Sequence, residues 1–264
     1  MLVLIVNGSP HTNGLCYRLL SRVAEGVKET GNDVEFVQLA KLDVKPCRAC
    51  SSAPCWSAMK CNFEDDALRI REVFNECDAF AFAAPVYFLS INGLAKNFVD
   101  RMRSYRKDTR PSLALTVAGG TGKGCITALQ EVCRWMILVG FVPVIAEPIT
   151  RYNFDEAYEL AKGWGHVLVE SVGKVPQLST LYEKLFYLEK LHYMRYTITD
   201  EILYLAKSTI EAISRRGKTE DTIDLRIKMN EAEAQLRLGY WKEGLRMAVE
   251  VQEESMRRFN RLVK

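Results

Sequence analysis

The first two thirds of the chain alternate between two hydrophobic periodicities. Short apolar runs, of which "LVLIV" is the first, are typical of strands that are buried on both faces of a parallel sheet. Apolar residues spaced three or four positions apart are typical of amphipathic helices. The runs predict strands at residues 2–6, 33–39, 78–86, 112–118 and 141–146. The helical spacing predicts helices after residue 14 and at about 66–76, 89–104, 123–139 and 154–172.

Strands that alternate with helices indicate βαβ units around one parallel sheet. We therefore predict an α/β fold over residues 1–174, a doubly wound three-layer sandwich with five strands in the flavodoxin-like order. The stretch "GKVPQLS" at 173–179 predicts a joint, because glycine and proline lie in a short polar segment. Only helical spacing follows it, which predicts an all-helical extension over 177–264. Its apolar stripes are Leu181/Leu185/Leu188/Leu191, Ile202/Leu205/Thr209/Ile213, Leu225/Met229/Ala232/Leu236 and Trp241/Leu245/Val249/Met256.

Composition narrows the classes of function. The chain of 264 residues is 48% hydrophobic and carries a formal net charge of +3. The sequence contains no extended basic patch, so we expect neither a nucleic-acid nor a membrane partner. Met1 leads directly into an apolar strand, and no apolar stretch approaches the roughly 20 residues that span a bilayer. These features favour a cytoplasmic protein.

A polar loop with two glycines follows the first predicted strand. "NGSPHTNGLC" at 7–16 lies where open α/β sheets bind anions, at a carboxyl strand end and a helix N-terminus. It lacks the G-x-G-x-x-G dinucleotide pattern and the P-loop lysine. Ser9, Thr12 and Asn13 offer short polar side chains, while Gly8 and Gly14 allow backbone N–H groups to approach a ligand. The loop is therefore either a cradle for a terminal phosphate or an ordinary polar turn.

Two more loops are predicted at the same edge of the sheet. "PVYFLSINGLAKNFVDR" at 85–101 places Tyr87 and Phe88 where a planar ring could stack on them. "AGGTGKG" at 118–124 is similar to a nucleotide-binding loop, but it has Gly124 where magnesium binding needs Ser or Thr. Its glycines instead permit a flat ligand to approach the backbone closely.

Together, these three loops resemble the NAD(P)H-dependent FMN reductase family of flavodoxin-like proteins over residues 1–172. The resemblance implies FMN, bound non-covalently at the carboxyl edge of the sheet. It places six residues around the FMN phosphate, namely Ser9, His11, Thr12, Asn13, Gly14 and Cys16. It places seven more along the ribityl chain and the flavin ring, namely Pro85, Val86, Tyr87, Phe88, Gly119, Gly120 and Thr121.

Four of the chain's eight cysteines lie together in one loop, at 45–62. Cys47, Cys50, Cys55 and Cys61 have C-x2-C-x4-C-x5-C spacing, and one short loop can direct four such sulfurs inward around a metal cluster. A reducing cytosol disfavours disulfides. Zinc ligation and unligated redox thiols remain as alternatives. Because the loop leaves the same sheet edge as the other three, we expect a metal centre there to lie close to the flavin.

The cysteine loop also resembles that of the iron–sulfur flavoproteins, a branch of the same family. This resemblance implies a [4Fe–4S] cluster that is held by the four cysteines. The branch usually has two residues between its second and third cysteines, where this chain has the four residues "SSAP".

We therefore predict an FMN-dependent electron-transfer oxidoreductase that pairs FMN with a [4Fe–4S] cluster. Its partner would be a one-electron donor or acceptor such as ferredoxin, or NAD(P)H. A cluster-free NAD(P)H-dependent FMN or quinone reductase is one alternative, and a flavin-binding, redox-sensing interaction protein is another. The sequence identifies no general acid or base. Aromatic residues at the start of the extension, among them Tyr182 and Phe186, predict a homo-oligomer, either a dimer or a tetramer.

Overall fold

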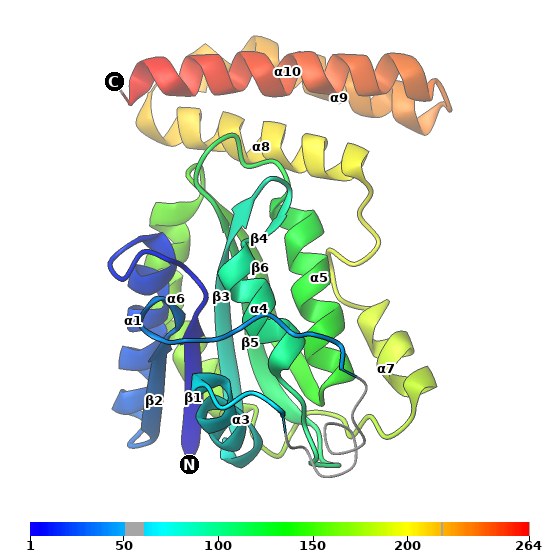
Figure 1. The fold of residues 1–264 in the computed structure, drawn as a ribbon. Coiled ribbons are helices and arrows are strands. Elements are labelled where there is room, and N and C mark those ends of the chain that lie inside the picture. Colours follow the sequence, from blue (N-terminus) through cyan, green and yellow to red (C-terminus); the bar gives the residue numbers. More distant parts are fainter. Residues whose placement is uncertain (51–60, 218, 264) are drawn as a thin grey trace.

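Five parallel strands form the centre of the molecule (Figure 1). The structure is a computed structural model, and it describes residues 1–50, 61–217 and 219–263. The sheet order is β2-β1-β3-β5-β6, which confirms the doubly wound, flavodoxin-like order predicted from the sequence. A sixth, two-residue strand, β4, pairs antiparallel with the end of β3. The strands are β1 (Leu2–Asn7), β2 (Asp33–Gln38), β3 (Ala79–Tyr87), β4 (Ser90–Ile91), β5 (Arg110–Ala118) and β6 (Phe141–Thr150).

The central strands are apolar on both faces because helices cover both faces of the sheet. In β1, Leu4 and Val6 belong to one buried cluster, whereas Val3 and Ile5 belong to the other. Successive side chains of a strand point to opposite faces, so a continuous apolar run supplies two cores at once. The strand that the run "LVLIV" predicts is therefore confirmed, because both of its faces lie in a core.

Two helical layers enclose the sheet (Figure 1). One face carries α1 (Leu15–Glu29) and α6 (Phe154–Glu170). The other carries α3 (Asp66–Glu76), α4 (Gly93–Arg101) and α5 (Cys125–Leu138). A short 3-10 helix, η1 (Leu39–Lys41), follows β2. The helix predicted at 89–104 begins four residues later than expected, because the intervening residues turn back to form β4.

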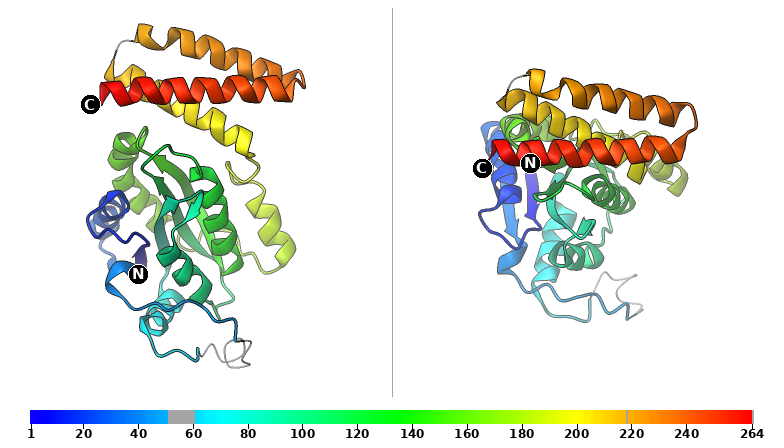
Figure 2. Two further views of the ribbon diagram at one scale, coloured as in Figure 1. Left: turned by 45° about the horizontal axis from the view of Figure 1, so that its top comes forward. Right: turned by 90° about the horizontal axis from the view of Figure 1, so that it is seen from above.

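The remainder of the described chain is helical, as predicted for the extension. Its α7 (Leu181–Leu188) packs along α5, and α8 (Ile198–Arg216) lies across the carboxyl edge of the sheet (Figure 1). After η2 (Thr219–Thr222), helices α9 (Ile223–Arg237) and α10 (Trp241–Leu262) stack on α8 (Figure 2). The extension therefore covers the end of the sandwich where the glycine-rich loops emerge.

Two of the four stripes predicted for the extension are buried only in part. In α7, Leu181 and Leu185 are 62% and 48% exposed, and only Leu188 is buried deeply. In α10, Trp241 is exposed, and the buried face is formed by Gly244, Ala248, Val251, Gln252, Ser255 and Phe259. α9 and α10 cross closely at the start of α10, where only glycine fits, because a Cβ on Gly244 would lie 2.6 Å from Leu236 Cγ. The stripes of α8 and most of that of α9 are buried as predicted.

Candidate functional site

Three loops meet at the carboxyl ends of β1, β3 and β5, which are neighbours in the sheet. The first loop is joined to β3 because Gly8 N–H donates to the Ala83 carbonyl at 2.8 Å. The second and third loops touch, since a Cβ added at Gly124 would lie only 2.4 Å from Leu89 Cα. The three sequence segments that resemble flavin loops thus form one continuous edge.

The first loop is held by buried polar side chains and presents exposed ones. Asn7 Oδ1 accepts from Ser9 N–H at 3.0 Å, and Ser9 Oγ accepts from His11 N–H at 3.1 Å. Asn7 and Ser9 are buried, while His11, Thr12 and Asn13 are exposed at the rim. A serine hydroxyl can donate its proton while its oxygen accepts a hydrogen bond, so Ser9 can also offer a donor to a ligand.

The N-terminus of α1 is suited to an anion. Gly14 is its N-cap residue and supplies no side-chain cap, and the first helical turn contains no acidic residue. The first N–H groups of a helix lack intrahelical partners, and the helix dipole makes this end positive. A phosphate beside Thr12 and Asn13 would match both features.

Cys16 differs from the other residues assigned to the phosphate. Its side chain is 2% exposed and packs in the core with Leu19 and Leu20. Burial raises the pKa of the Cys16 thiol to about 12, although a backbone hydrogen bond opposes this shift. Its thiol is therefore a packing group, and only its backbone N–H remains to serve the loop.

The second loop begins with a tight hairpin between β3 and β4. Its two central residues, Phe88 and Leu89, have left-handed φ values of 50° and 73°. Bulky residues rarely adopt this conformation, which costs roughly 1–2 kcal/mol per residue. Phe88 is fully exposed and Tyr87 is 47% exposed, whereas Val86 is half-buried and Pro85 is buried. Strain of this kind concentrates at binding sites.

The third loop leaves open space beside its backbone. A Cβ added at Gly119 or Gly120 would meet no atom within 4 Å. Both glycines and Thr121 are exposed at the end of β5, next to the hairpin of the second loop. A planar group can therefore approach this backbone without steric obstruction.

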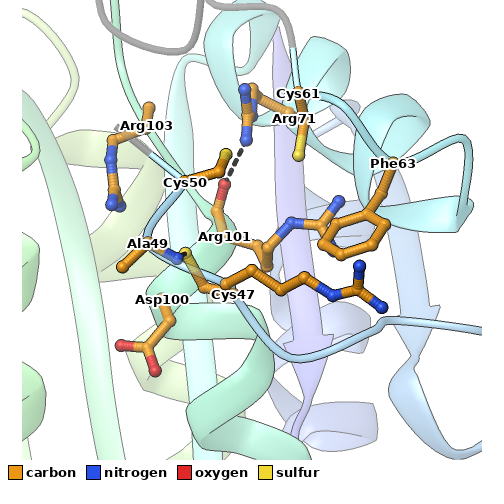
Figure 3. Close-up of a pocket in the computed structure, with 10 residues that line it drawn as sticks. Cys47, Ala49, Cys50, Cys61, Phe63, Arg71, Asp100, Arg101 and Arg103 are labelled. Atoms are coloured by element: carbon orange, nitrogen blue, oxygen red, sulfur yellow. Dashed lines mark hydrogen bonds between the residues drawn. The ribbon is translucent and has the colours of Figure 1, made fainter. Parts of the chain in front are cut away.

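The cysteine loop runs along α4. Asn97 Nδ2 on α4 donates to the Val44 carbonyl at 3.3 Å, and Arg101 donates to the Lys45 carbonyl at 2.8 Å. The loop then enters a pocket of about 150 Å³ (Figure 3). The pocket is lined by Cys47, Arg48, Ala49, Cys50, Cys61, Phe63, Arg71, Asp100, Arg101 and Arg103. Cys55, the third predicted ligand, lies outside the described residues.

A buried ion pair fixes one wall of this pocket. Arg101 donates to the two carboxylate oxygens of Asp65 at 2.7 and 2.8 Å, and both side chains are almost fully buried. Burial opposes ionisation of Asp65, but hydrogen bonds from Arg101 and from backbone N–H groups outweigh it, so the pKa of Asp65 is lowered. Burial likewise lowers the pKa of Arg101, yet its contacts with Asp65 and the Cys61 thiol raise it overall.

Donors and cations surround the described thiols. Ala49 N–H lies 3.5 Å from Cys47 Sγ, and Asn62 Nδ2 lies 3.6 Å from Cys50 Sγ. Within the described ranges, no three His, Cys, Asp or Glu side chains are arranged to hold a metal ion. The described part of the pocket thus provides sulfur atoms, N–H donors and positive charge around them.

The two candidate sites lie at opposite ends of α4. Gly93, at its start, follows the hairpin of the second loop, and Arg101, at its end, lines the cysteine pocket. The helix has nine residues, which corresponds to a length of about 13 Å. Cys47, Cys50 and Cys61 therefore lie at the end of α4 that points away from the loop edge. The loop leaves β2 at that edge, but its hydrogen bonds to α4 carry it to the far end.

The sequence did not indicate which residues of the extension reach the loops. Leu205 on α8 is buried with Ala118 and Cys125 of the third loop and α5. Tyr193, Tyr196 and Tyr204 pack around this cluster together with Val86. Helical periodicity identified Leu205 as a buried position but not its partner, because the contact joins segments far apart in the sequence.

The parallel five-stranded sheet and the helices on both of its faces define a flavodoxin-like protein, with three loops meeting at the carboxyl edge of the sheet. The sequence model of the NADPH-dependent FMN reductase family matches residues 1–149. The chain belongs to this family, and it is an FMN-dependent oxidoreductase.

Among curated proteins, an iron–sulfur flavoprotein of Archaeoglobus fulgidus is 29% identical over 58% of this chain and 78% of its own length. An iron–sulfur flavoprotein of Methanocaldococcus jannaschii is 26% identical over 65% of this chain and 97% of its own length. Among solved structures, an NAD(P)H:quinone oxidoreductase from Methanothermobacter marburgensis has a TM-score of 0.52 at 20% identity, covering 64% of this chain and 97% of that one. The last likeness shows the fold.

Proposed function

We propose that this oxidoreductase holds a [4Fe–4S] cluster as well as FMN, and that it transfers electrons between a one-electron partner such as ferredoxin and a two-electron partner such as NAD(P)H. The observation that carries the proposal is the pocket that three cysteines line together with four arginines. The relatives named iron–sulfur flavoproteins support it. The proposed ligands are Cys47, Cys50, Cys55 and Cys61.

The chemistry of the cysteine pocket suits an anionic cluster. Four thiolates around a [4Fe–4S] core give a net negative charge, which the guanidinium groups of Arg48, Arg71 and Arg103 oppose, whereas Arg101 is already paired with Asp65. Hydrogen bonds to the sulfurs, such as that of Ala49 N–H to Cys47 Sγ, tune the potential of such clusters. Thiols stay reduced and available in the cytosol, the compartment that we propose for the protein.

The three loops suit FMN. The uncapped N-terminus of α1 and the polar rim of Thr12 and Asn13 would receive the phosphate. The open backbone at Gly119 and Gly120 and the exposed ring of Tyr87 would receive the flavin ring. When bound, FMN would supply both one- and two-electron redox chemistry, while the chain supplies binding, orientation and electrostatics.

Alanine variants test the ligand assignment. We expect C47A, C50A, C55A and C61A, each purified anaerobically, to lose most of their iron and to keep their FMN. C133A is the matched control, because Cys133 is buried in α5 within the core. Iron that persists in all four variants, or that is lost equally in C133A, would contradict the assignment.

A cluster-free NAD(P)H-dependent FMN or quinone reductase is the second candidate. The family to which the chain belongs favours it. It predicts rapid bleaching of bound flavin by NADPH in preparations that contain no iron. Bleaching that requires reduced ferredoxin and an intact set of cysteines would favour the two-cofactor proposal instead.

A further inference from the structure

The helical extension places a buried carboxylate at the start of α5. Glu201, on α8, is 5% exposed. One of its oxygens accepts from Gly124 N–H at 2.5 Å, and the other accepts from Ile126 and Thr127 N–H at 3.1 and 3.0 Å. The Thr127 hydroxyl lies 3.3 Å from that second oxygen. A residue about 75 positions away in sequence thus satisfies the first N–H groups of α5, which lack intrahelical partners.

These contacts fix two of the loops proposed to bind the flavin ring. Gly124 has a left-handed φ of 86° and lies directly against Leu89, at the tip of the hairpin. One turn further along α8, Leu205 packs against the same loop, since a Cβ added at Gly122 would lie 2.6 Å from Leu205 Cδ2. The carboxylate of Glu201 therefore holds the third loop directly and the second loop through it.

The contact also determines the charge at this edge. A helix N-terminus attracts anions, and charge-assisted hydrogen bonds to it are stronger than neutral ones. Glu201 occupies that position in α5, so "GTGKG" cannot offer its helix end to a nucleotide phosphate. The N-terminus of α1 has no such carboxylate and stays available to an anion at the loop edge, whereas Glu201 of α8 places a negative charge at the start of α5.

We propose that Glu201 is a positioning residue of the flavin site: it holds the two ring-binding loops in place, and its charge lowers the reduction potential of bound FMN. The alignment with the M. jannaschii relative spans 97% of that protein but only 65% of this chain. The rest of this chain has no counterpart in that alignment. The inference rests on the proposed binding of FMN at the three loops.

The test compares full-length E201Q with wild type and with E211Q. Glu211 lies on the same helix but is exposed, so E211Q makes the same change in net charge away from the loops. We expect FMN and riboflavin to bind E201Q about tenfold more weakly, equivalent to the loss of one charge-assisted hydrogen bond. Riboflavin lacks the phosphate of FMN. An equal loss of affinity for both ligands would therefore show that E201Q weakens the contacts with the flavin ring and not those with the phosphate.

Two further readouts separate positioning from general stability. The midpoint potential of bound FMN should rise in E201Q and stay at the wild-type value in E211Q. Amide hydrogen exchange should become faster at 119–127 in E201Q while the 8–14 loop keeps its protection. L205A, which removes packing but no charge, should weaken flavin binding without raising the potential. If circular dichroism shows that E201Q is unfolded, the flavin affinity and the hydrogen exchange of L205A test the positioning role instead.

Wild-type affinity for FMN is measured first, and a wild-type chain that binds no flavin would contradict the proposed function itself. If wild type binds FMN while E201Q matches E211Q in affinity, potential and exchange, the inference about Glu201 is wrong and the proposed function stands.

Discussion

Asp65 illustrates how one side chain organises the cysteine pocket. It caps α3 by accepting from Ala67 N–H, accepts from Lys45 N–H at 3.0 Å, and pairs with Arg101 at the end of α4. The cysteine loop, α3 and α4 are therefore joined at one carboxylate. Four clustered cysteines are a local pattern that the sequence displays directly, whereas this pair is assembled by tertiary structure, so no spacing pattern could have revealed it.

Replacement of Asp65 should destabilise the fold strongly. Removing one partner of a buried ion pair leaves the other charge uncompensated, so we expect D65N to lower the free energy of unfolding by about 3–5 kcal/mol at pH 7. E72Q is the control, because Glu72 is exposed on the same helix. Urea denaturation of the two variants and wild type measures the difference.

The same pair predicts a pH dependence. The pKa of Asp65 is lower in the folded protein than its ordinary value near 4, so its contribution is complete above that value and is lost as pH falls through the folded pKa. The gap in stability between wild type and D65N should therefore shrink as the pH falls below about 4. A gap that stays constant down to the acid limit of folding would contradict this account.

At the scale of elements, predictions succeeded where periodicity was simple and failed where a special backbone or a close crossing decided the outcome. The five parallel strands and the helices of the sandwich follow from apolar runs and amphipathic spacing. The β3–β4 hairpin was missed because Phe88 and Leu89 occupy positions where Gly or Asn is usual. The buried face of α10 was misplaced because its first two turns bury the small residues Gly244 and Ala248 rather than the larger Trp241 and Leu245.

Relief of the hairpin strain should stabilise the protein. Leu89 has a φ of 73° and is 55% exposed, so glycine there removes left-handed strain and loses little packing. We expect L89G to raise the free energy of unfolding by about 1 kcal/mol. L160G, at an exposed position inside α6, should lower it by about 1 kcal/mol. Thermal or urea unfolding checks both signs, and a destabilised L89G would contradict the strain argument.

At the scale of the whole molecule, the extension leaves an apolar face uncovered. Leu181, Tyr182, Leu185 and Phe186 on α7 are each about half exposed or more, and the rings of Tyr182 and Phe186 stack at 5.9 Å. Within the described residues, no helix is long and apolar enough to cross a membrane. Exposed apolar faces of this kind are typical of protein interfaces.

We therefore expect a homo-oligomer. Light scattering should give a mass of two or four times 30.0 kDa for wild type. F186E should shift the mass toward 30.0 kDa, because a charge desolvated in an apolar interface is costly. Y240E is the control, since Tyr240 is an exposed aromatic residue at the turn before α10. A wild-type monomer at micromolar concentration would contradict the expectation.

The pairing of FMN with an iron–sulfur cluster is tested most directly by one anaerobic preparation of the wild-type chain, in which iron, acid-labile sulfide, zinc and FMN are quantified together. The account predicts about four iron and four sulfide per FMN, with a visible spectrum that contains both cluster and flavin absorption. FMN without iron, or with zinc in place of iron, would contradict it.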